Sequence, residues 1–211
     1  MKIISHTHPL YRRIWSMAAA NKYNGAYFYS KEICDRIIPN VKTDYNWITV
    51  NIQGIGCDHA IVFIHNNKNP NHYDWLSRYK DLILVCGIPE TCEKVAHLGR
   101  TIYLPLSINV EEVKSYKQEK TKDTAYAGRP NKKKGLVLPK NISYLENLPR
   151  GELLDRMAQY KYIYAVGRTA IESKALVCEI LPYDPRFPDP ERWQVIDNLD
   201  AARMLQEELD R

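Results

Sequence analysis

The segment YIYAVGRTAIESKALVCEIL, residues 162–181, determines the fold class. It begins with an apolar, β-rich run at 162–166, continues with a helical pattern at 169–176, and returns to an apolar run at 178–181. This order of strand, helix and strand predicts two parallel strands joined by a helix. Ligands of parallel sheets lie beyond the carboxyl ends of the strands, so the residues directly after each strand are candidates for a site.

The same alternation extends along most of the chain. Further strands are predicted at 2–5, 26–29, 47–50, 60–65, 82–86, 101–104, 124–127, 135–138 and 142–145, and further helices at 9–22, 31–38, 73–79, 89–98, 151–159 and 191–210. A polar stretch at 111–123, read as a linker or surface helix, interrupts the pattern. We therefore expect an α/β protein with two small Rossmann-like lobes that face each other across a cleft. The predicted lobes are 1–115, on the acceptor side, and 116–211, which binds a nucleotide sugar, with the final helix packing back onto the first lobe.

Composition and charge narrow the class of protein. With 211 residues and 45% hydrophobic content, the chain has material for one medium domain or two small ones. It has no apolar run near the ~20 residues of a membrane span and no signal peptide, so we expect a soluble, cytoplasmic protein. Five irregularly spaced cysteines predict neither a disulfide framework nor a zinc site. The net charge of +5 is modest for a nucleic-acid binder and suits a site that receives phosphates.

The first candidate for a phosphate site is the loop AGRPNKKKG at 127–135, which follows a predicted strand. Gly128 allows the backbone to approach a ligand closely. The guanidinium of Arg129 can bind two phosphate oxygens, and Lys134 can add a positive charge. The competing interpretation is a basic turn exposed to solvent.

The second candidate is Gly167-Arg168-Thr169, where a predicted strand turns into a helix. A helix N-terminus offers backbone N–H groups and the positive end of the helix dipole to a phosphate. Glu172 lies about one turn into that helix, where its carboxylate could hold a ribose diol. The alternative is that Thr169 and Glu172 form a capping box, and the two interpretations are compatible.

Histidines supply the candidates for chemistry. His65 ends the predicted strand at 60–65, where it could touch a substrate or act as a base; the alternative is a histidine bonded to backbone. His6 and His8 follow the first predicted strand, without a third ligand that would complete a metal site. We expect this loop to face the cleft and predict no metal.

Together, the glycine–arginine loop and the later strand–helix step resemble the donor-binding lobe of GT-B glycosyltransferases. The likeness is to the large group that uses nucleotide sugars and has a Gly-Arg…Glu-Lys-Gly loop. The resemblance implies that Arg129 and Lys134 bind the donor diphosphate and that Glu172 binds the ribose. Residues 57–66 are similar to the family's strand that ends in a histidine lining the sugar and acceptor cleft, which implies that role for His65.

The function implied by this resemblance is transfer of a sugar from a nucleotide-sugar donor to an unknown acceptor. His65 or His8 would contact the sugar or activate the acceptor hydroxyl, and the donor is a substrate, with no further cofactor. The expected donor site consists of Gly128, Arg129, Lys134, Gly167, Arg168, Thr169 and Glu172.

Two alternatives stay open. Retaining members of the family carry a first glutamate at the position of Tyr164, which favours a non-catalytic protein of the same fold that binds a nucleotide or nucleotide sugar. The second alternative is a glycosyltransferase that modifies DNA. It ranks last because no interleaving of aromatic and basic residues and no groove-reading helix stands out in the sequence.

Overall fold

The computed structural model describes residues 29, 31–49, 58–64, 74–128 and 138–211. The described chain divides into two compact units: residues 31–105 join Leu199–Arg211 in the first, and Leu106–Asn198 forms most of the second. The elements predicted at 2–5 and 9–22, and nearly all of those at 26–29 and 135–138, lie outside the described residues.

The first unit contains a parallel sheet with the strand order β1-β2-β3-β4. The strands are β1 (Asn46–Thr49), β2 (His59–Ile64), β3 (Asp81–Cys86) and β4 (Arg100–Tyr103). β2 and β3 are nearly continuous apolar runs and are buried along almost their whole length, as expected for parallel strands covered on both faces. The predicted strands at 47–50, 60–65, 82–86 and 101–104 are therefore confirmed within one or two residues.

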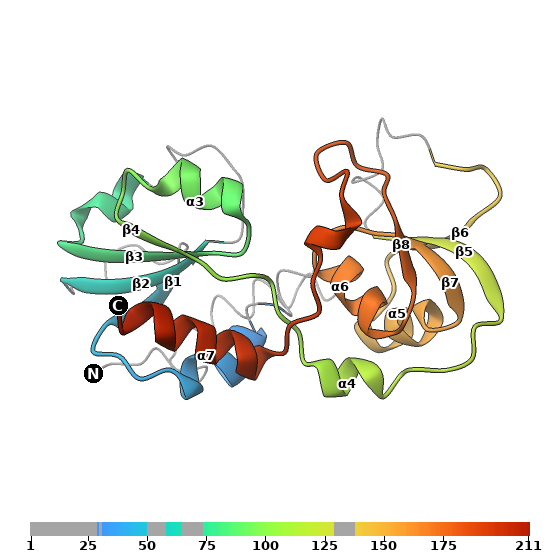
Figure 1. Ribbon diagram of the computed structural model, residues 1–211, viewed down its shortest axis with the longest axis horizontal. Coiled ribbons are helices and arrows are strands. Elements are labelled where there is room, and N and C mark those ends of the chain that lie inside the picture. The colour runs from blue at the N-terminus through green and yellow to red at the C-terminus, as the bar shows by residue number, and fades with distance from the viewer. Residues whose placement is uncertain (1–28, 30, 50–57, 65–73, 129–137) are drawn as a thin grey trace. The chain divides into compact units, whose positions relative to one another are not determined.

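Helices cover both faces of this sheet. α3 (Pro89–Val95), with its proline in the first turn, lies on one face, and α7 (Asn198–Leu209) lies on the other (Figure 1). The backbone of Lys42 donates to Oε1 of Gln206 at 2.7 Å and accepts from its Nε2 at 3.2 Å, which ties α7 to the segment before β1. The expectation that the final helix packs onto the first lobe is confirmed. The helices predicted at 31–38 and 73–79 appear as the short helices η1 (Ile33–Ile37), η2 (Ile38–Asn40) and η4 (Asp74–Arg78).

The second unit contains a separate parallel sheet with the strand order β6-β5-β7-β8. The strands are β5 (Lys122–Ala127), β6 (Ser143–Leu145), β7 (Tyr160–Tyr164) and β8 (Glu179–Leu181). The chain leaves β5 for β6 on one side and then crosses back to β7 on the other side of β5. Successive connections therefore run to opposite sides of the sheet, which makes the position between β5 and β7 a topological switch point. Open α/β sheets bind ligands at such points.

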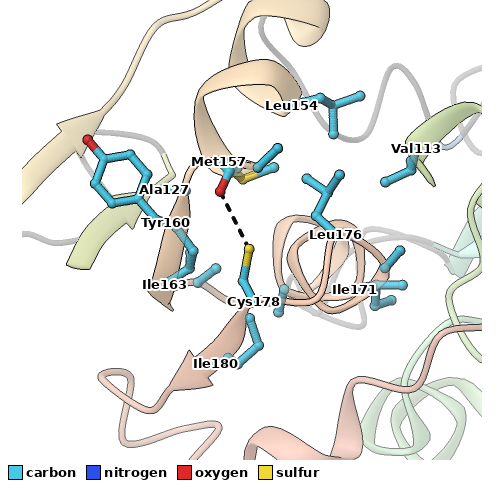
Figure 2. Close-up of a cluster of buried hydrophobic side chains, with 14 of the residues drawn as sticks. Val113, Ala127, Leu154, Met157, Tyr160, Ile163, Ile171, Leu176, Cys178 and Ile180 are labelled. Carbon is cyan, nitrogen blue, oxygen red and sulfur yellow. Dashed lines mark hydrogen bonds between the residues drawn. The ribbon is translucent and has the colours of Figure 1, made fainter. Parts of the chain in front are cut away.

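Two helices pack on one face of this second sheet. α5 (Arg150–Met157) and α6 (Arg168–Ala175) lie side by side there (Figure 1). Figure 2 shows the core between sheet and helices, which contains Ala127, Ile163 and Ile180 from the strands and Leu154, Met157, Ile171 and Leu176 from the helical side. The two sheets and their parallel strands confirm the α/β prediction, whereas a cleft between two facing lobes stays a prediction.

The predicted helix at 191–210 is wrong over its first part. Only a short 3-10 helix, η6 (Pro190–Arg192), precedes α7, and 193–197 is not helical. The backbone there pairs with Ile108, whose N–H donates to Ile196 at 3.0 Å, and the carboxylate of Asp197 accepts from the N–H of Val110 at 3.1 Å. These distant partners hold the segment extended.

The polar stretch at 111–123 includes most of α4 (Val110–Lys114) and a lysine, Lys120, that bonds the C-terminal ends of two helices. Nζ of Lys120 donates to the carbonyls of Ala158 at 2.9 Å and Leu176 at 2.8 Å, and to Sγ of Cys178 at 3.1 Å. Ala158 and Leu176 end α5 and α6. One ammonium group thus caps the negative ends of two helix dipoles.

Candidate functional site

The carboxyl edge of the second sheet, which we define as the residues that directly follow its four strands, is the candidate site. Gly128 follows β5, Glu146 follows β6, the turn at 165–167 follows β7, and the turn at 182–184 follows β8. Because the four strands are parallel, these residues stand at one edge. Gly128 and Gly167 flank the switch point between β5 and β7.

Gly167 begins α6 in a conformation that favours glycine. Its φ of 64° and ψ of −139° lie in a region that residues with a side chain rarely adopt, and no side chain caps this end of the helix. A Cβ at this position would meet nothing within 4 Å, so the backbone rather than crowding requires the glycine. The strand-to-helix turn predicted here is present, and it places the N-terminus of α6 at the carboxyl edge, where such folds bind phosphate groups.

Glu172 is enclosed by two arginines. Its Oε1 accepts hydrogen bonds from Nε of Arg168 at 2.7 Å and from the guanidinium of Arg150. The side chains are 5% exposed for Glu172, 8% for Arg168 and 10% for Arg150. The capping-box interpretation is wrong, because Gly167 is the N-cap and Thr169 already lies inside the first turn.

The same cluster extends to α4. Nε of Arg150 lies 3.4 Å from Oε1 of Glu112, and Asn109, which caps α4, donates to the other carboxylate oxygen of Glu112 at 3.2 Å. The cluster therefore joins α4, α5 and α6. Sequence analysis missed Arg150, although a cation in the first turn of a helix is unfavourable and signals a partner elsewhere.

Gly128 has a local reason to be a glycine. A Cβ on this residue would lie 2.7 Å from the hydroxyl oxygen of Tyr126 and 3.0 Å from its Cζ. The buried tyrosine thus occupies the space of a side chain, whether or not a ligand also approaches the backbone there.

Four tyrosines, which we call the tyrosine row, lie on the sheet face opposite α5 and α6. Tyr144, Tyr126 and Tyr164 are aligned across β6, β5 and β7, and Tyr183 packs against two of them. Ring centroids are 6.0 Å apart for Tyr126 and Tyr144, 5.4 Å for Tyr126 and Tyr183, and 6.4 Å for Tyr164 and Tyr183. Sequence analysis did not identify the row, although its members alternate with core residues along the strands.

Carboxylates adjoin the tyrosine row. Burial, the hydroxyl of Tyr183 and the carboxylates of Glu146 and Asp184 all raise the pKa of Tyr126, so its hydroxyl stays protonated. Asp184 is itself buried and accepts from Nε of Arg186 at 2.9 Å and from the Arg186 backbone at 3.1 Å. This edge therefore combines aromatic surface, hydroxyl donors and carboxylate acceptors.

Arg129, Lys134, His65 and His8 lie outside the described residues, so their roles stay predictions. Within the described chain, no three His, Cys, Asp or Glu side chains gather closely enough to hold a metal ion. Among the same residues, no helix has the length and apolar character needed to span a bilayer.

Comparison of the chain with models of protein families, with curated proteins and with solved structures finds no match.

Proposed function

We propose that this protein binds a nucleoside diphosphate sugar at the carboxyl edge of its second sheet and transfers the sugar to an acceptor. The observation that carries the proposal is the switch point between β5 and β7, flanked by Gly128 and by the Gly167 turn into α6. Parallel sheets bind ligands at such points, and a helix N-terminus there favours a phosphate group.

In this proposal the diphosphate lies at the start of α6. The side chain of Arg168 is bound to Glu172, so this residue contributes its backbone N–H rather than its guanidinium. Arg129 and Lys134, the two cations predicted from the sequence, neutralise the charge that develops on the departing diphosphate. His65 or His8 contacts the sugar or activates the acceptor hydroxyl.

A second candidate is a protein that binds the same nucleotide without catalysis. Tyr164 favours it, because this position carries a glutamate in the retaining enzymes that the sequence resembles, whereas here the ring packs against Tyr183 within the tyrosine row. Turnover separates the two candidates, since both bind nucleotide.

Thermal stabilisation tests the shared claim. ADP, GDP, UDP, CDP and their common sugar conjugates are screened. A ligand at ~100 times its Kd stabilises a protein by about 2.7 kcal/mol. Arg129→Ala should weaken binding about 10- to 100-fold, on the scale of a hydrogen bond to a charged group. Lys122→Ala, at the first residue of β5 and so at the opposite end of the sheet, serves as the control.

Mass spectrometry of the same samples then measures released nucleoside diphosphate. Release from a bound sugar conjugate supports the transferase, and binding without release supports the non-catalytic protein. A screen in which no nucleotide stabilises the protein would refute both.

A further inference from the structure

We infer that Glu146, rather than Glu172, binds the ribose diol of the nucleotide. The inference rests on the proposed function and deepens it by assigning the nucleoside part of the ligand. In Rossmann-type sheets, an acidic residue about 20 positions after the first strand–helix turn binds the ribose, at the end of the strand that follows in sequence. Glu146 has this position: it directly follows β6, which pairs with β5 through Ala127 and Leu145, next to Gly128.

The pleat of β6 directs Tyr144 and Glu146 to the same side. Leu145 points into the core with α5 and α6, so its two neighbours lie on the opposite face of the sheet, the face of the tyrosine row. The Tyr144 side chain is 43% exposed and packs on the buried ring of Tyr126. Tyr144 thus offers an aromatic surface that rests on Tyr126. Proteins bind bases of any identity by stacking them on such surfaces.

Glu146 has the chemistry that a diol requires. The residue is partly exposed, its Oε1 is buried, and its charge acts on the nearby hydroxyl of Tyr126. A carboxylate accepts hydrogen bonds from two adjacent hydroxyl groups, and bonds to a charged acceptor are stronger than neutral ones.

Glu172 is a poorer ribose ligand in this chain. The side chains of both arginines that enclose it are at most 10% exposed, and its Oε1 already accepts from each of them. A diol at this carboxylate would compete with two charged donors for Oε1. Glu172 instead joins α5 and α6, and the ribose role passes to Glu146 at the end of β6.

The test is isothermal titration of wild-type protein and variants with ADP, GDP, UDP and CDP, and with the 2′-deoxy forms. For whichever base binds, we expect the ribonucleotide to bind about 10-fold more tightly than its deoxy form. Glu146→Gln should weaken the ribonucleotide about 10-fold and the deoxy form less, because the deoxy form bonds this carboxylate through its 3′-hydroxyl alone, so the preference for the ribonucleotide falls. Glu179→Gln, an exposed carboxylate at the opposite end of the sheet, should change neither.

A second variant guards against a folding defect in the first. Tyr144→Ala should weaken ribo and deoxy forms equally, by about 10-fold, because it removes stacking rather than a contact to the 2′-hydroxyl. A Glu146→Gln protein that keeps the ribonucleotide preference overturns the inference while the proposed function stands. The same holds if Glu172→Gln, not Glu146→Gln, lowers the preference. If none of the four diphosphates binds wild-type protein, the inference and the proposed function fall together.

Discussion

Replacing Glu172 by glutamine should destabilise the second unit by about 3 kcal/mol. The carboxylate stands between two guanidinium groups, and all three side chains are at most 10% exposed. Removing one partner of a buried ion pair costs about 3–5 kcal/mol, because the remaining charge is left without compensation. Glutamine retains one acceptor oxygen, which places the expected loss at the lower end of that range.

Urea-dependent amide hydrogen exchange, read by mass spectrometry, measures this loss separately in each unit. Peptides from β5 and β7 report the second unit, and peptides from β2 and β3 provide an internal reference in the first. With a urea dependence of about 1–3 kcal/mol per molar, the midpoint of the second unit should fall by about 1–3 M. The first unit should unfold at its original midpoint.

Glu112→Gln is the matched control. This carboxylate bonds the same Arg150, at 3.4 Å, but its side chain is 43% exposed. A pair so open to solvent contributes about 0–1 kcal/mol. If Glu172→Gln and Glu112→Gln had equally small effects, the enclosed carboxylate would not stabilise the unit, and our account of the cluster would be refuted.

Three further predictions concern single residues. Gly128→Ala should cost about 1–3 kcal/mol in urea unfolding, and Tyr126→Phe should recover part of it by removing the hydroxyl 2.7 Å from the new Cβ; additive losses would contradict the predicted clash. Lys120→Met should cost about 1–2 kcal/mol in the same assay, since both α5 and α6 lose a C-terminal cap; an unchanged midpoint would contradict the capping role. A hydrogen bond from Tyr45 lowers the pKa of Asp81 in the folded chain, so this carboxylate stabilises the first unit above about pH 4 and the contribution is lost as pH falls through the folded pKa. Asp81→Asn should therefore flatten the acid limb of the first unit's stability curve, and an unaltered acid titration would contradict this.

The central strands β2 and β3 were predictable because they are apolar over most of their length. The runs at 60–65 and 82–86 have few polar residues, so no register or partner was needed to recognise them. The helix predicted at 191–210 failed where structure depends on distant residues. Residues 196–198 pair with Ile108, which is distant in the sequence, and no local sequence pattern predicts such a bridge.

The candidate site was predicted in part for the same reason. Gly167 and its turn follow from a local strand–helix pattern, and the structure has both. Glu172 was named as a ribose ligand or a capping-box residue, but its partner Arg150 lies on another helix, so their pairing is a tertiary contact. The tyrosine row likewise becomes a single surface only through the register of three strands.

The most direct test of the central claim is the mapping of bound nucleotide onto backbone amides by NMR. Titration with the nucleoside diphosphate that binds most tightly should shift the amides of Gly128, Glu146 and 167–169, at the carboxyl edge of the second sheet. The amides of Lys120 and Cys178, at the opposite end of the sheet, should stay in place. Shifts centred on Lys120 and Cys178, with none at the carboxyl edge, would contradict the account.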